Sequence, residues 1–451
     1  MTADGDTVAA VSSSRKLSPA SNQKLFTTGV AMKMLGPGYR FETKLATDGR
    51  IEDGTLKGDL YIIGGGDPTI GSTQKGMPSL SDVFGEWKKI LTDSGIKRIE
   101  GRVIGDPRWF DGEDYHDDWP PEDTGFDYGA AVSGLNFHEN IHTLSLEPGS
   151  KEGDPVRLEQ VYPTLPWMKY SVSAKTVSSK GSDRTWLLNT PLMPVGNLCG
   201  TFPLGYKTKT NFSNCFPAFT CAQYFCNYLD DNRIKVTGGP ADVDPFGCVR
   251  EDPSVAGARP APDSLTTVLG SYCSPTLKEI ATVANFHSNN FYTEAIFRAL
   301  SKKICGSASI PASRRTLKDL LYTITSRRDA KIADGCGLSR KNFLTPEFMV
   351  RFLRRMAREK VFCDYLETIP TPGNGTIIAR FAKREPEFKE RIHMKSGSMG
   401  GIRCYSGYIL PSDGNPGKMI VFSVMTGGNT TGPIGANAAL EKIIGALAEE
   451  N

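Results

Sequence analysis

Hydrophobic positions recur at helical spacing near the start of the chain. Over residues Asn22–Leu35 the apolar side chains fall on one face, and Gly36-Pro37 then ends the run. The residues on that face are Leu25, Val30, Ala31, Met34 and Leu35. The pattern predicts a helix over these residues, with its apolar side chains on one face.

The pattern changes twice further along the chain. Residues 40–263 consist of short β-prone runs separated by Gly and Pro, which is typical of one or two mostly β domains. Helical periodicity returns from Leu265. Ser274-Pro275 and Thr345-Pro346 each combine a capping side chain with a first-turn proline, so both predict helix starts.

The last quarter predicts three strands and a closing helix. The strands are residues 391–399, 403–410 and 418–425, and the turn-rich PSDGNPG joins the last two as a hairpin. The closing helix carries one apolar face, made of Leu440, Ile443, Ile444 and Leu447. We expect this face to pack against the sheet rather than to lie on a membrane surface.

The composition narrows the class of protein. Of the 451 residues, 39% are hydrophobic and 23% charged, which is enough apolar material for cores, so extensive disorder is excluded. The formal net charge of +3 gives no sign of a nucleic-acid partner. The longest strongly apolar run, Met419–Met425, is too short to cross a bilayer, so we expect no integral membrane segment.

The cysteines leave two interpretations open. Four of the ten crowd one segment with spacings that match no zinc ribbon: Cys199, Cys215, Cys221 and Cys226. They are either free buried thiols or one or two disulfides in an oxidising compartment.

Three polar features of the sequence are better explained by a structural role than by a binding or catalytic role. The stretch Gly64–Pro68 lacks the Gly-Lys-Ser/Thr of a phosphate loop and predicts a tight turn. The segment 106–127 holds nine acidic residues against one basic residue, mixed with aromatic side chains, and we expect it to be solvated surface. None of the five histidines has metal-ligand spacing, so no metal site is predicted: His116, His138, His142, His287 and His393.

A serine and a lysine at the start of the first helix suggest nucleophilic catalysis. Ser21 and Lys24 are three residues apart, which puts their side chains on one helical face. A serine hydroxyl needs a base, and a lysine amine can act as one if its pKa is lowered. The helix N-terminus would also favour negative charge developing at the serine. Ser-x-x-Lys alone is a weak signal, because it recurs by chance in long chains.

Two further motifs strengthen this interpretation. Ser288-Asn289-Asn290 falls in a predicted loop between helices, and Lys395-Ser396-Gly397-Ser398 lies on a predicted strand. Ser-x-x-Lys, Ser-x-Asn and Lys-Thr/Ser-Gly occur in that order in penicillin-binding proteins and class A β-lactamases. The order and the helix, loop and strand settings together make the signal strong.

With these motifs the chain resembles the class C low-molecular-mass penicillin-binding proteins, the D-alanyl-D-alanine carboxypeptidase/endopeptidases of the penicillin-binding protein 4 type. Five local stretches are similar to this family: PASNQKLFTT, LYIIGGGDP, SNNFYTEAIFR, DGCGLSR and KSGSMGGIRCYSGYI. The resemblance as a whole covers nearly the whole chain. The 267 residues between Ser21 and Ser288 far exceed the spacing in class A β-lactamases and simpler carboxypeptidases.

The resemblance implies an α/β (α+β) multidomain fold. The penicillin-binding, β-lactamase-like catalytic domain, an antiparallel sheet flanked by helices, would comprise residues 1–43 and 265–451. Two mostly β domains would be inserted: domain II at residues 44–70 and 161–264, and domain III at residues 71–160. By this resemblance, the family's first strand and helix ahead of the nucleophile would be truncated here.

The resemblance also implies catalytic roles. Ser21 would attack the carbonyl between two D-alanines and form an acyl-enzyme, with Lys24 as its general base. Lys395 would help to keep Lys24 neutral, because two nearby cations disfavour each other. Ser288 would pass the proton to the leaving amine, hydrogen-bonded to both lysines. The backbone N–H groups of Ser21 and Ser398 would form the oxyanion hole.

The remaining motif residues would bind substrate. Asn290 would hold the substrate's amide, and the hydroxyls of Ser396 and Ser398, with Gly397 between them, would bind the terminal carboxylate beside the cationic Lys395. Two positions depart from the family pattern. Ser396 replaces the usual threonine but keeps the hydroxyl, so we expect function to survive, and Cys336 replaces a common serine without a clear consequence.

The leading hypothesis is therefore a serine D-alanyl-D-alanine carboxypeptidase that acts on peptidoglycan stem peptides and is acylated by β-lactams. D,D-endopeptidase action on cross-links stays open. Two alternatives are a β-lactamase or esterase with the same Ser-x-x-Lys apparatus, and an inactive wall-binding scaffold. The scaffold is disfavoured because Ser21, Lys24, Ser288, Asn290 and Lys395 are all present.

Location follows from the substrate. The N-terminus MTADGDTVAA lacks a secretory pattern. Peptidoglycan lies outside the cytoplasmic membrane, so a periplasmic or extracytoplasmic enzyme with a removed signal peptide is expected. The mechanism needs neither metal nor organic cofactor.

Overall fold

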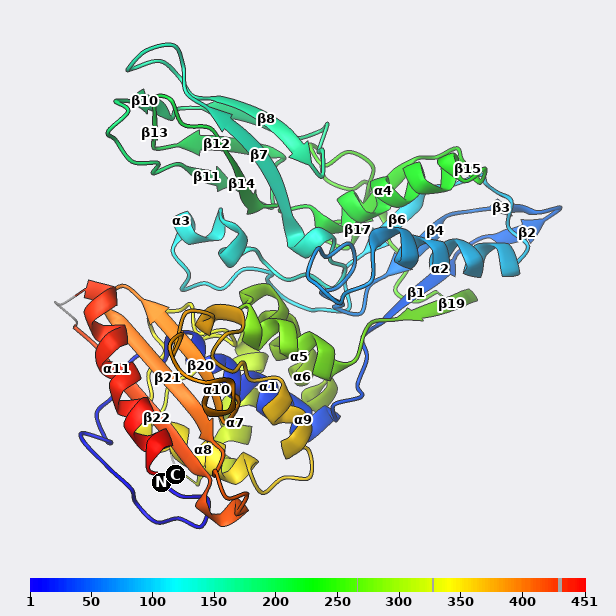
Figure 1. Ribbon diagram of the computed structural model, residues 1–451. Helices are drawn as coiled ribbons and strands as arrows, with labels where there is room; N and C mark the ends of the chain where they lie inside the picture. Colours follow the sequence, from blue (N-terminus) through cyan, green and yellow to red (C-terminus); the bar gives the residue numbers. More distant parts are fainter. Residues whose placement is uncertain (266, 327, 429–431) are drawn as a thin grey trace. The chain divides into compact units, whose positions relative to one another are not determined.

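The computed structural model describes residues 1–265, 267–326, 328–428 and 432–451, which form two compact units (Figure 1). Unit 1 comprises Met1–Tyr39, His116–Asp118 and Thr276–Asn451, and unit 2 comprises Arg40–Tyr115 and Trp119–Pro275. The sequence-based division was placed at residues 43 and 265. The observed units divide at Tyr39 and Thr276 because β1 (Glu42–Thr47) and β19 (Thr267–Cys273) pair with each other inside unit 2.

Unit 1 is built around a three-stranded antiparallel sheet. Its order is β20 (Ile392–Met399), β21 (Ile402–Ile409) and β22 (Ile420–Thr426), so all three predicted strands and the hairpin are confirmed. Residues Met1–Ala3 run along the edge of β22, where Val421 N–H donates to the Met1 carbonyl at 2.8 Å.

Helices cover both faces of this sheet. On one face α11 (Gly432–Glu449) buries Leu440 and Ile444 against β20–β22, as the closing-helix pattern predicts, although Ile443 is exposed. On the other face α8 (Pro346–Met356) contacts β21 and β22 (Figure 1). The remaining helical elements of unit 1 are η1 (Ala20–Gln23), α1 (Lys24–Leu35), α5 (Leu277–Phe286), α6 (Asn290–Cys305), α7 (Ile310–Thr325), α9 (Phe362–Glu367), η4 (Gly375–Ile377), α10 (Pro386–Glu390) and η5 (Pro416–Lys418).

The first helix differs from its prediction. Residues 24–32 of α1 are all buried, because α5, α6, α7 and α9 surround it, whereas Met34 is 39% exposed. The predicted helix and its end at Gly36 are therefore confirmed, but burial extends beyond the face that carries the apolar positions. The buried side chains include Lys24 and the polar Thr27 and Thr28, so the centre of unit 1 is not purely apolar.

Of the two predicted helix starts, one is confirmed and the other is displaced by two residues. Thr345 caps α8 by accepting the Phe348 N–H, with Pro346 in the first turn, as predicted. The other start was placed two residues early: Thr276, not Ser274, caps α5, in a reciprocal capping box with Glu279.

Unit 2 combines several sheets with two long helices, α2 (Leu80–Asp93) and α4 (Pro217–Asp231). Its largest sheet has seven strands in the order β18-β17-β16-β6-β4-β1-β19, and a four-stranded sheet has the order β15-β5-β3-β2. The strands of these two sheets, besides β1 and β19, are β2 (Arg50–Glu52), β3 (Thr55–Lys57), β4 (Leu60–Ile63), β5 (Arg98–Ile99), β6 (Val103–Asp106), β15 (Lys235–Val236), β16 (Pro240–Val243), β17 (Cys248–Arg250) and β18 (Arg259–Pro260).

A second group of strands in unit 2 has its own apolar core. This core includes Leu144, Leu187, Leu198 and Phe212. The strands are β7 (Ile141–Glu147), β8 (Arg157–Tyr162), β9 (Lys169–Val172), β10 (Lys175–Val177), β11 (Trp186–Asn189), β12 (Val195–Cys199), β13 (Thr201–Pro203) and β14 (Thr208–Ser213), and the short helices nearby are α3 (Pro121–Thr124), η2 (Asp127–Gly129) and η3 (His138–Asn140). The proposed boundary between residues 160 and 161 falls inside β8. The division of the inserted part into domains II and III stays a prediction.

The cysteines and the helices bear on two sequence-based expectations. All ten cysteines are free thiols, and Cys221 and Cys226 are buried on α4. No helix in the described part of the chain is long and apolar enough to cross a membrane.

Candidate active site

The predicted nucleophile and base lie at the junction of η1 and α1. The single 3₁₀ turn of η1 starts at Ala20, which has φ +44°, and continues directly into α1. This turn brings Lys24 Nζ to 3.1 Å from Ser21 Oγ. The geometry predicted from the Ser-x-x-Lys spacing is thus present.

Lys24 is fully buried among neutral hydrogen-bond acceptors. Besides Ser21, its ammonium group donates to Asn290 Oδ1 at 2.6 Å and to the Cys336 carbonyl at 2.8 Å. Burial lowers the pKa of Lys24 below its ordinary value, and this effect outweighs the opposing influence of Cys336, Asp334 and Glu294. A neutral amine within reach of a serine hydroxyl can act as a general base.

Ser288 and Lys395 form the second half of the site. Ser288 lies between α5 and α6 with φ +54°, and its Oγ accepts a hydrogen bond from Lys395 Nζ at 3.0 Å. Lys395 on β20 also donates to the Ser396 carbonyl at 2.8 Å. Among the described residues Ser288 is bonded to Lys395 and not to Lys24, so one of its two expected partners is absent. Burial, and then the positive charge of Lys24, lower the pKa of Lys395 well below its ordinary value.

Glycines let two segments approach the nucleophile closely. A Cβ at Gly397 on β20 would lie 2.6 Å from the Pro19 carbonyl and 3.2 Å from the backbone nitrogen of Asn22. A Cβ at Gly337, which has φ +91°, would lie 2.0 Å from the Ala20 carbonyl. The strand and the loop therefore pack directly on η1, and any side chain at either glycine would push them away.

The segment around Ser21 is also anchored from behind. Asn22 Nδ2 donates to Ser406 Oγ at 2.8 Å, and Ser406 donates in turn to Ser423 at 2.9 Å. Gln23 donates to the Asp334 carbonyl and to Asn342 Oδ1. The nucleophile is therefore fixed to the sheet on one side and to the loop after α7 on the other.

The binding residues on β20 include a contact that the sequence did not suggest. Thr376 Oγ1 lies 2.8 Å from Ser396 Oγ, at the exposed rim of the site. Beside Ser398, a pocket of about 250 Å³ is lined by Ser18, Arg340, Met399, Gly400 and Ile402. Thr376 follows Gly375 in a turn, and no motif in the sequence distinguishes it.

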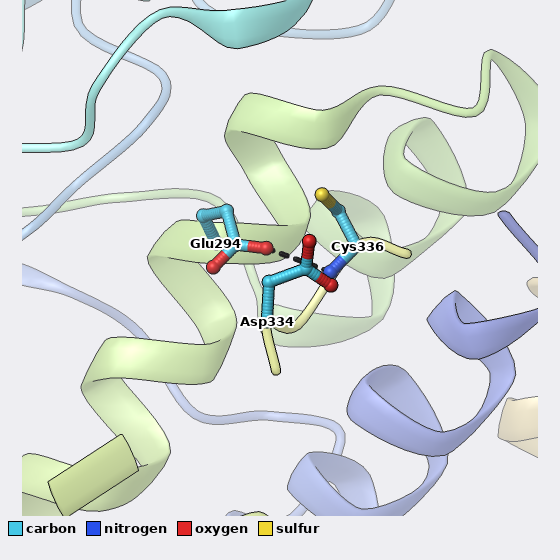
Figure 2. A group of neighbouring side chains, drawn as sticks. All are labelled: Glu294, Asp334 and Cys336. Atoms are coloured by element: carbon cyan, nitrogen blue, oxygen red, sulfur yellow. Dashed lines mark hydrogen bonds between the residues drawn. The ribbon is translucent and has the colours of Figure 1, made fainter. Parts of the chain in front are cut away.

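Glu294, Asp334 and Cys336 lie close enough together to hold a metal ion (Figure 2). Their oxygens are already used, however. Glu294 Oε1 accepts the N–H groups of Gly335 and Cys336 at 2.9 and 2.7 Å, and Asp334 accepts those of Gly337 and Ser339 at 2.7 and 2.5 Å. Burial raises the pKa of the Cys336 thiol well above its ordinary value, so the thiolate that a metal prefers is disfavoured. The cluster organises the loop backbone.

The acidic segment is only partly solvated surface. His116 and Trp119 are buried, and the Asp118 side chain is 2% exposed. The expectation is wrong for these residues because Arg314 and Glu294 of unit 1 supply partners for the carboxylate and the imidazole. The aromatic residues that lie among the acidic residues are the feature of the sequence that could have predicted this burial.

Two lysines buried beside two serines, supplied by a helix, a loop and a strand, define a serine hydrolase of the penicillin-binding type. A sequence profile of the D-Ala-D-Ala carboxypeptidase 3 (S13) family matches residues 1–449. The chain belongs to this family. The predicted enzyme class, a serine-type D-alanyl-D-alanine carboxypeptidase, is confirmed, as is the multidomain penicillin-binding fold.

Individual relatives agree with this assignment. A D-alanyl-D-alanine carboxypeptidase of Actinomadura sp. is 26% identical over 451 residues, covering 95% of this chain and 77% of the relative. Penicillin binding protein 4 (dacB) of Haemophilus influenzae superposes with a TM-score of 0.78 at 22% identity, covering 98% of this chain and 93% of the other. A second structure of that protein, complexed with a β-lactam, gives a TM-score of 0.73 at 21% identity, covering 98% and 92%.

Proposed function

We propose that this chain removes the terminal D-alanine from peptidoglycan stem peptides through an acyl-enzyme on Ser21. The observation that carries the proposal is the 3.1 Å contact between Lys24 Nζ and Ser21 Oγ, made by a lysine that is completely buried. Burial lowers the pKa of Lys24 below its ordinary value, which favours the neutral amine that a general base requires.

The acylation step follows from these contacts. Lys24 takes the hydroxyl proton as Ser21 Oγ attacks the carbonyl carbon between the two D-alanines. The backbone N–H groups of Ser21 and Ser398 stabilise the oxyanion. The C–N bond then breaks as Ser288, held by Lys395 at 3.0 Å, gives its hydroxyl proton to the departing amine and takes up the proton that Lys24 removed from Ser21. Water afterwards hydrolyses the ester, which releases the shortened peptide and restores the Ser21 hydroxyl.

The second lysine connects substrate binding to base strength. The substrate's terminal carboxylate would bind the hydroxyls of Ser396 and Ser398 beside Lys395. An anion there would raise the pKa of Lys395 and favour its charged form. The charge on Lys395 would in turn disfavour a proton on Lys24, so carboxylate binding would prepare the base.

The pocket beside Ser398 offers room for the next part of the stem peptide. Arg340 lines it, so an acidic substituent would be favoured over a basic one. The β-lactam in the structure of the Haemophilus influenzae protein makes covalent inhibition by β-lactams a proposal for this chain as well. Since the substrate lies outside the cytoplasmic membrane, we place the enzyme there.

Intact mass after incubation with benzylpenicillin tests the proposal, with Ser21→Ala as the matched variant. A stable single-penicilloyl mass increase that disappears in Ser21→Ala is the expected result. Rapid destruction of penicillin without an adduct would favour the β-lactamase alternative. Intact penicillin without an adduct would favour the inactive wall-binding scaffold. Release of D-alanine from a pentapeptide, compared with cleavage of cross-linked muropeptides, then separates carboxypeptidase from endopeptidase action.

A further inference from the structure

Three residues from the middle of the sequence belong to unit 1. The chain leaves unit 2 at Tyr115, contributes His116–Asp118 to unit 1, and returns to unit 2 at Trp119. We call His116–Asp118 the strap. It lies far in sequence from every catalytic motif, yet two of its side chains lead to the loop that contacts Lys24.

The first connection starts at His116. Its Nε2 lies 2.9 Å from Glu294 Oε2, and both side chains are buried. Glu294 Oε1 accepts the backbone N–H groups of Gly335 and Cys336, the second of which is drawn in Figure 2. The carbonyl of Cys336 then accepts a hydrogen bond from Lys24 Nζ at 2.8 Å. A short chain of hydrogen bonds thus runs from His116 to the proposed base.

The second connection starts at Asp118. Its Oδ2 accepts the Ser339 hydroxyl at 2.9 Å, and its Oδ1 accepts an N–H of Arg314 at 2.9 Å. Arg314 also bonds the Ala333 carbonyl. Asp118 and Arg314 therefore hold both ends of the loop 333–339, while His116 acts through Glu294 on its middle.

On the side that faces η1 and α1, loop 333–339 is closely packed. Gly337 packs on the Ala20 carbonyl so closely that even a Cβ would collide, and Thr27 Oγ1 bonds the Gly335 carbonyl at 2.6 Å. A displacement of the loop would therefore carry the Cys336 carbonyl with it and change the direction from which Lys24 approaches Ser21. Displacements of about 1 Å in such groups can cost about 100-fold in rate.

We propose that His116 and Asp118 are positioning residues for Lys24, acting through Glu294, Ser339 and the Cys336 carbonyl. This rests on the proposed function, because it takes Lys24 as the base that activates Ser21. Neither strap residue contacts substrate or the reacting atoms in this scheme. Their contribution is to the rate of acylation once a ligand is bound.

The test separates binding from acylation for a chromogenic β-lactam, using the full chain. Stopped-flow kinetics gives the dissociation constant of the non-covalent complex and the acylation rate constant, each measured up to alkaline pH where Lys24 is neutral. We expect His116→Leu to lower the plateau acylation rate constant by about 10-fold or more with the dissociation constant unchanged. His116→Gln, which keeps an N–H donor for Glu294, should restore most of the rate.

A second variant and a matched control complete the test. Ser339→Ala removes the hydroxyl that donates to Asp118 and accepts the Lys341 N–H, and it should lower the same rate constant by a few fold, so the proposal stays testable if His116→Leu does not fold. His138→Leu is the control, because His138 is a buried histidine of unit 2 whose ring nitrogen bonds the Gly71 carbonyl. It should leave the acylation rate constant of folded protein unchanged.

Two results would overturn the inference. One is an unchanged plateau rate constant in both folded His116→Leu and Ser339→Ala. The other is an equal loss in His138→Leu, which would indicate general destabilisation. The proposed function fails separately, by absence of a Ser21-dependent adduct in the wild-type chain.

Discussion

The two units bury charged side chains in contrasting ways. In unit 2 the buried Asp242 lies against the buried Arg250 at 2.6 Å, with two parallel hydrogen bonds. At the centre of unit 1, Lys24 and Lys395 are both 0% exposed and donate to neutral oxygens. Among the described residues neither lysine has a carboxylate within ion-pair distance. Burying an amine without a carboxylate partner disfavours its protonated form, so the lysines of unit 1 lack the opposite charge that offsets part of the desolvation of Asp242 in unit 2.

The effects on pKa follow the same division. Burial raises the pKa of Asp242, and Arg250 opposes this by stabilising the carboxylate. Burial lowers the pKa of Lys395, and Lys24 adds to this because it is a like charge. The opposite charge of Arg250 opposes the pKa shift of Asp242, whereas the like charge of Lys24 adds to the pKa shift of Lys395. This contrast supports the proposed role of the lysine pair without reference to any motif.

The largest expected effect comes from removing the buried base. Lys24→Met keeps the volume and removes the amine, so acylation by benzylpenicillin should fall by about 1,000-fold or more, because general-base assistance is lost. The melting temperature should stay the same or rise, since a desolvated amine is replaced by an apolar side chain. Acylation followed by mass spectrometry and thermal unfolding measure the two consequences on the same sample.

The matched control lies on the same helix. Lys33 on α1 is partly exposed and pairs with Glu359. Lys33→Met should therefore change acylation and stability little. A large fall in melting temperature for Lys24→Met would contradict the comparison, because it would place Lys24 among the stabilising charges.

Arg250→Met is the converse experiment in unit 2. It leaves Asp242 buried without its partner and removes a guanidinium that lies 5.0 Å from the centre of the Phe216 ring. We expect a loss of about 3–5 kcal/mol in the free energy of unfolding. The acylation rate per folded molecule should be unchanged. Measuring the amount of penicilloyl adduct together with the amount of folded protein would check this. A lower acylation rate in fully folded Arg250→Met would show that the Asp242–Arg250 pair also influences the active site.

The sequence predicted which motif residues lie together better than it predicted the packing. Ser-x-x-Lys, Ser-x-Asn and Lys-Ser-Gly lie on local elements whose signals are strong: a helix start, a loop between helices and an alternating strand. The contact between Lys24 and Ser21 needs only one helical turn. Local geometry therefore carried these predictions.

What the sequence missed depends on contacts between distant segments. His116 and Glu294 meet across 178 residues, and Thr376 and Ser396 meet through a loop that has no periodic pattern. The apolar pattern of α1 places its hydrophobic residues on one face and contains no sign that its polar residues are buried as well. Four other helices surround it, so even Lys24 is buried. Tertiary partners decide burial in these cases, and no single segment contains that information.

Asp67 is an exception within unit 2 that sharpens the comparison. It is 1% exposed, accepts two hydrogen bonds from Thr69, and its Oδ2 has no partner among the described residues. Burial raises the pKa of Asp67 to about 6, although Thr69 opposes the shift. The folded state thus binds this proton more tightly than the unfolded state. The stability it contributes is complete below pH 4 and is lost as the pH rises through 6.

Asp67→Asn should therefore stabilise the protein in a pH-dependent way. The substitution keeps the oxygen that Thr69 bonds and removes the charge, so a gain of about 1–3 kcal/mol is expected at pH 7.5 and none below pH 4. Denaturant unfolding of variant and wild type at both pH values measures the difference. Because the pKa of His142 is lowered to about 3 by burial, wild-type stability also falls towards acid, and only the difference between the two proteins isolates Asp67. An equal gain at both pH values would contradict the assignment.

The smallest expected effect concerns the exposed rim of the site. A substrate carboxylate only accepts hydrogen bonds, so when Ser396 donates its single proton to it, the 2.8 Å contact with Thr376 must be donated by Thr376. Thr376→Val removes that donor and keeps the shape. D-alanine release should lose about 3- to 10-fold in kcat/KM, the value of roughly 1 kcal/mol for one hydrogen bond. The loss should appear mainly in KM, in contrast with the acylation effect of Lys24→Met.

A double-mutant cycle with Ser396→Thr decides whether orientation is the cause. A serine samples three rotamers, whereas the methyl group of a threonine restricts its side chain without help from a neighbour. If Thr376 orients the Ser396 hydroxyl, Thr376→Val should cost less in the Ser396→Thr background than in the wild type, with a coupling of several tenths of a kcal/mol or more. Additive losses would mean that Thr376 contacts the substrate directly. In that case the rim would bind the carboxylate with independent hydroxyls, and the coupling between neighbouring side chains proposed for Lys24 and Lys395 would not extend to the surface of the site.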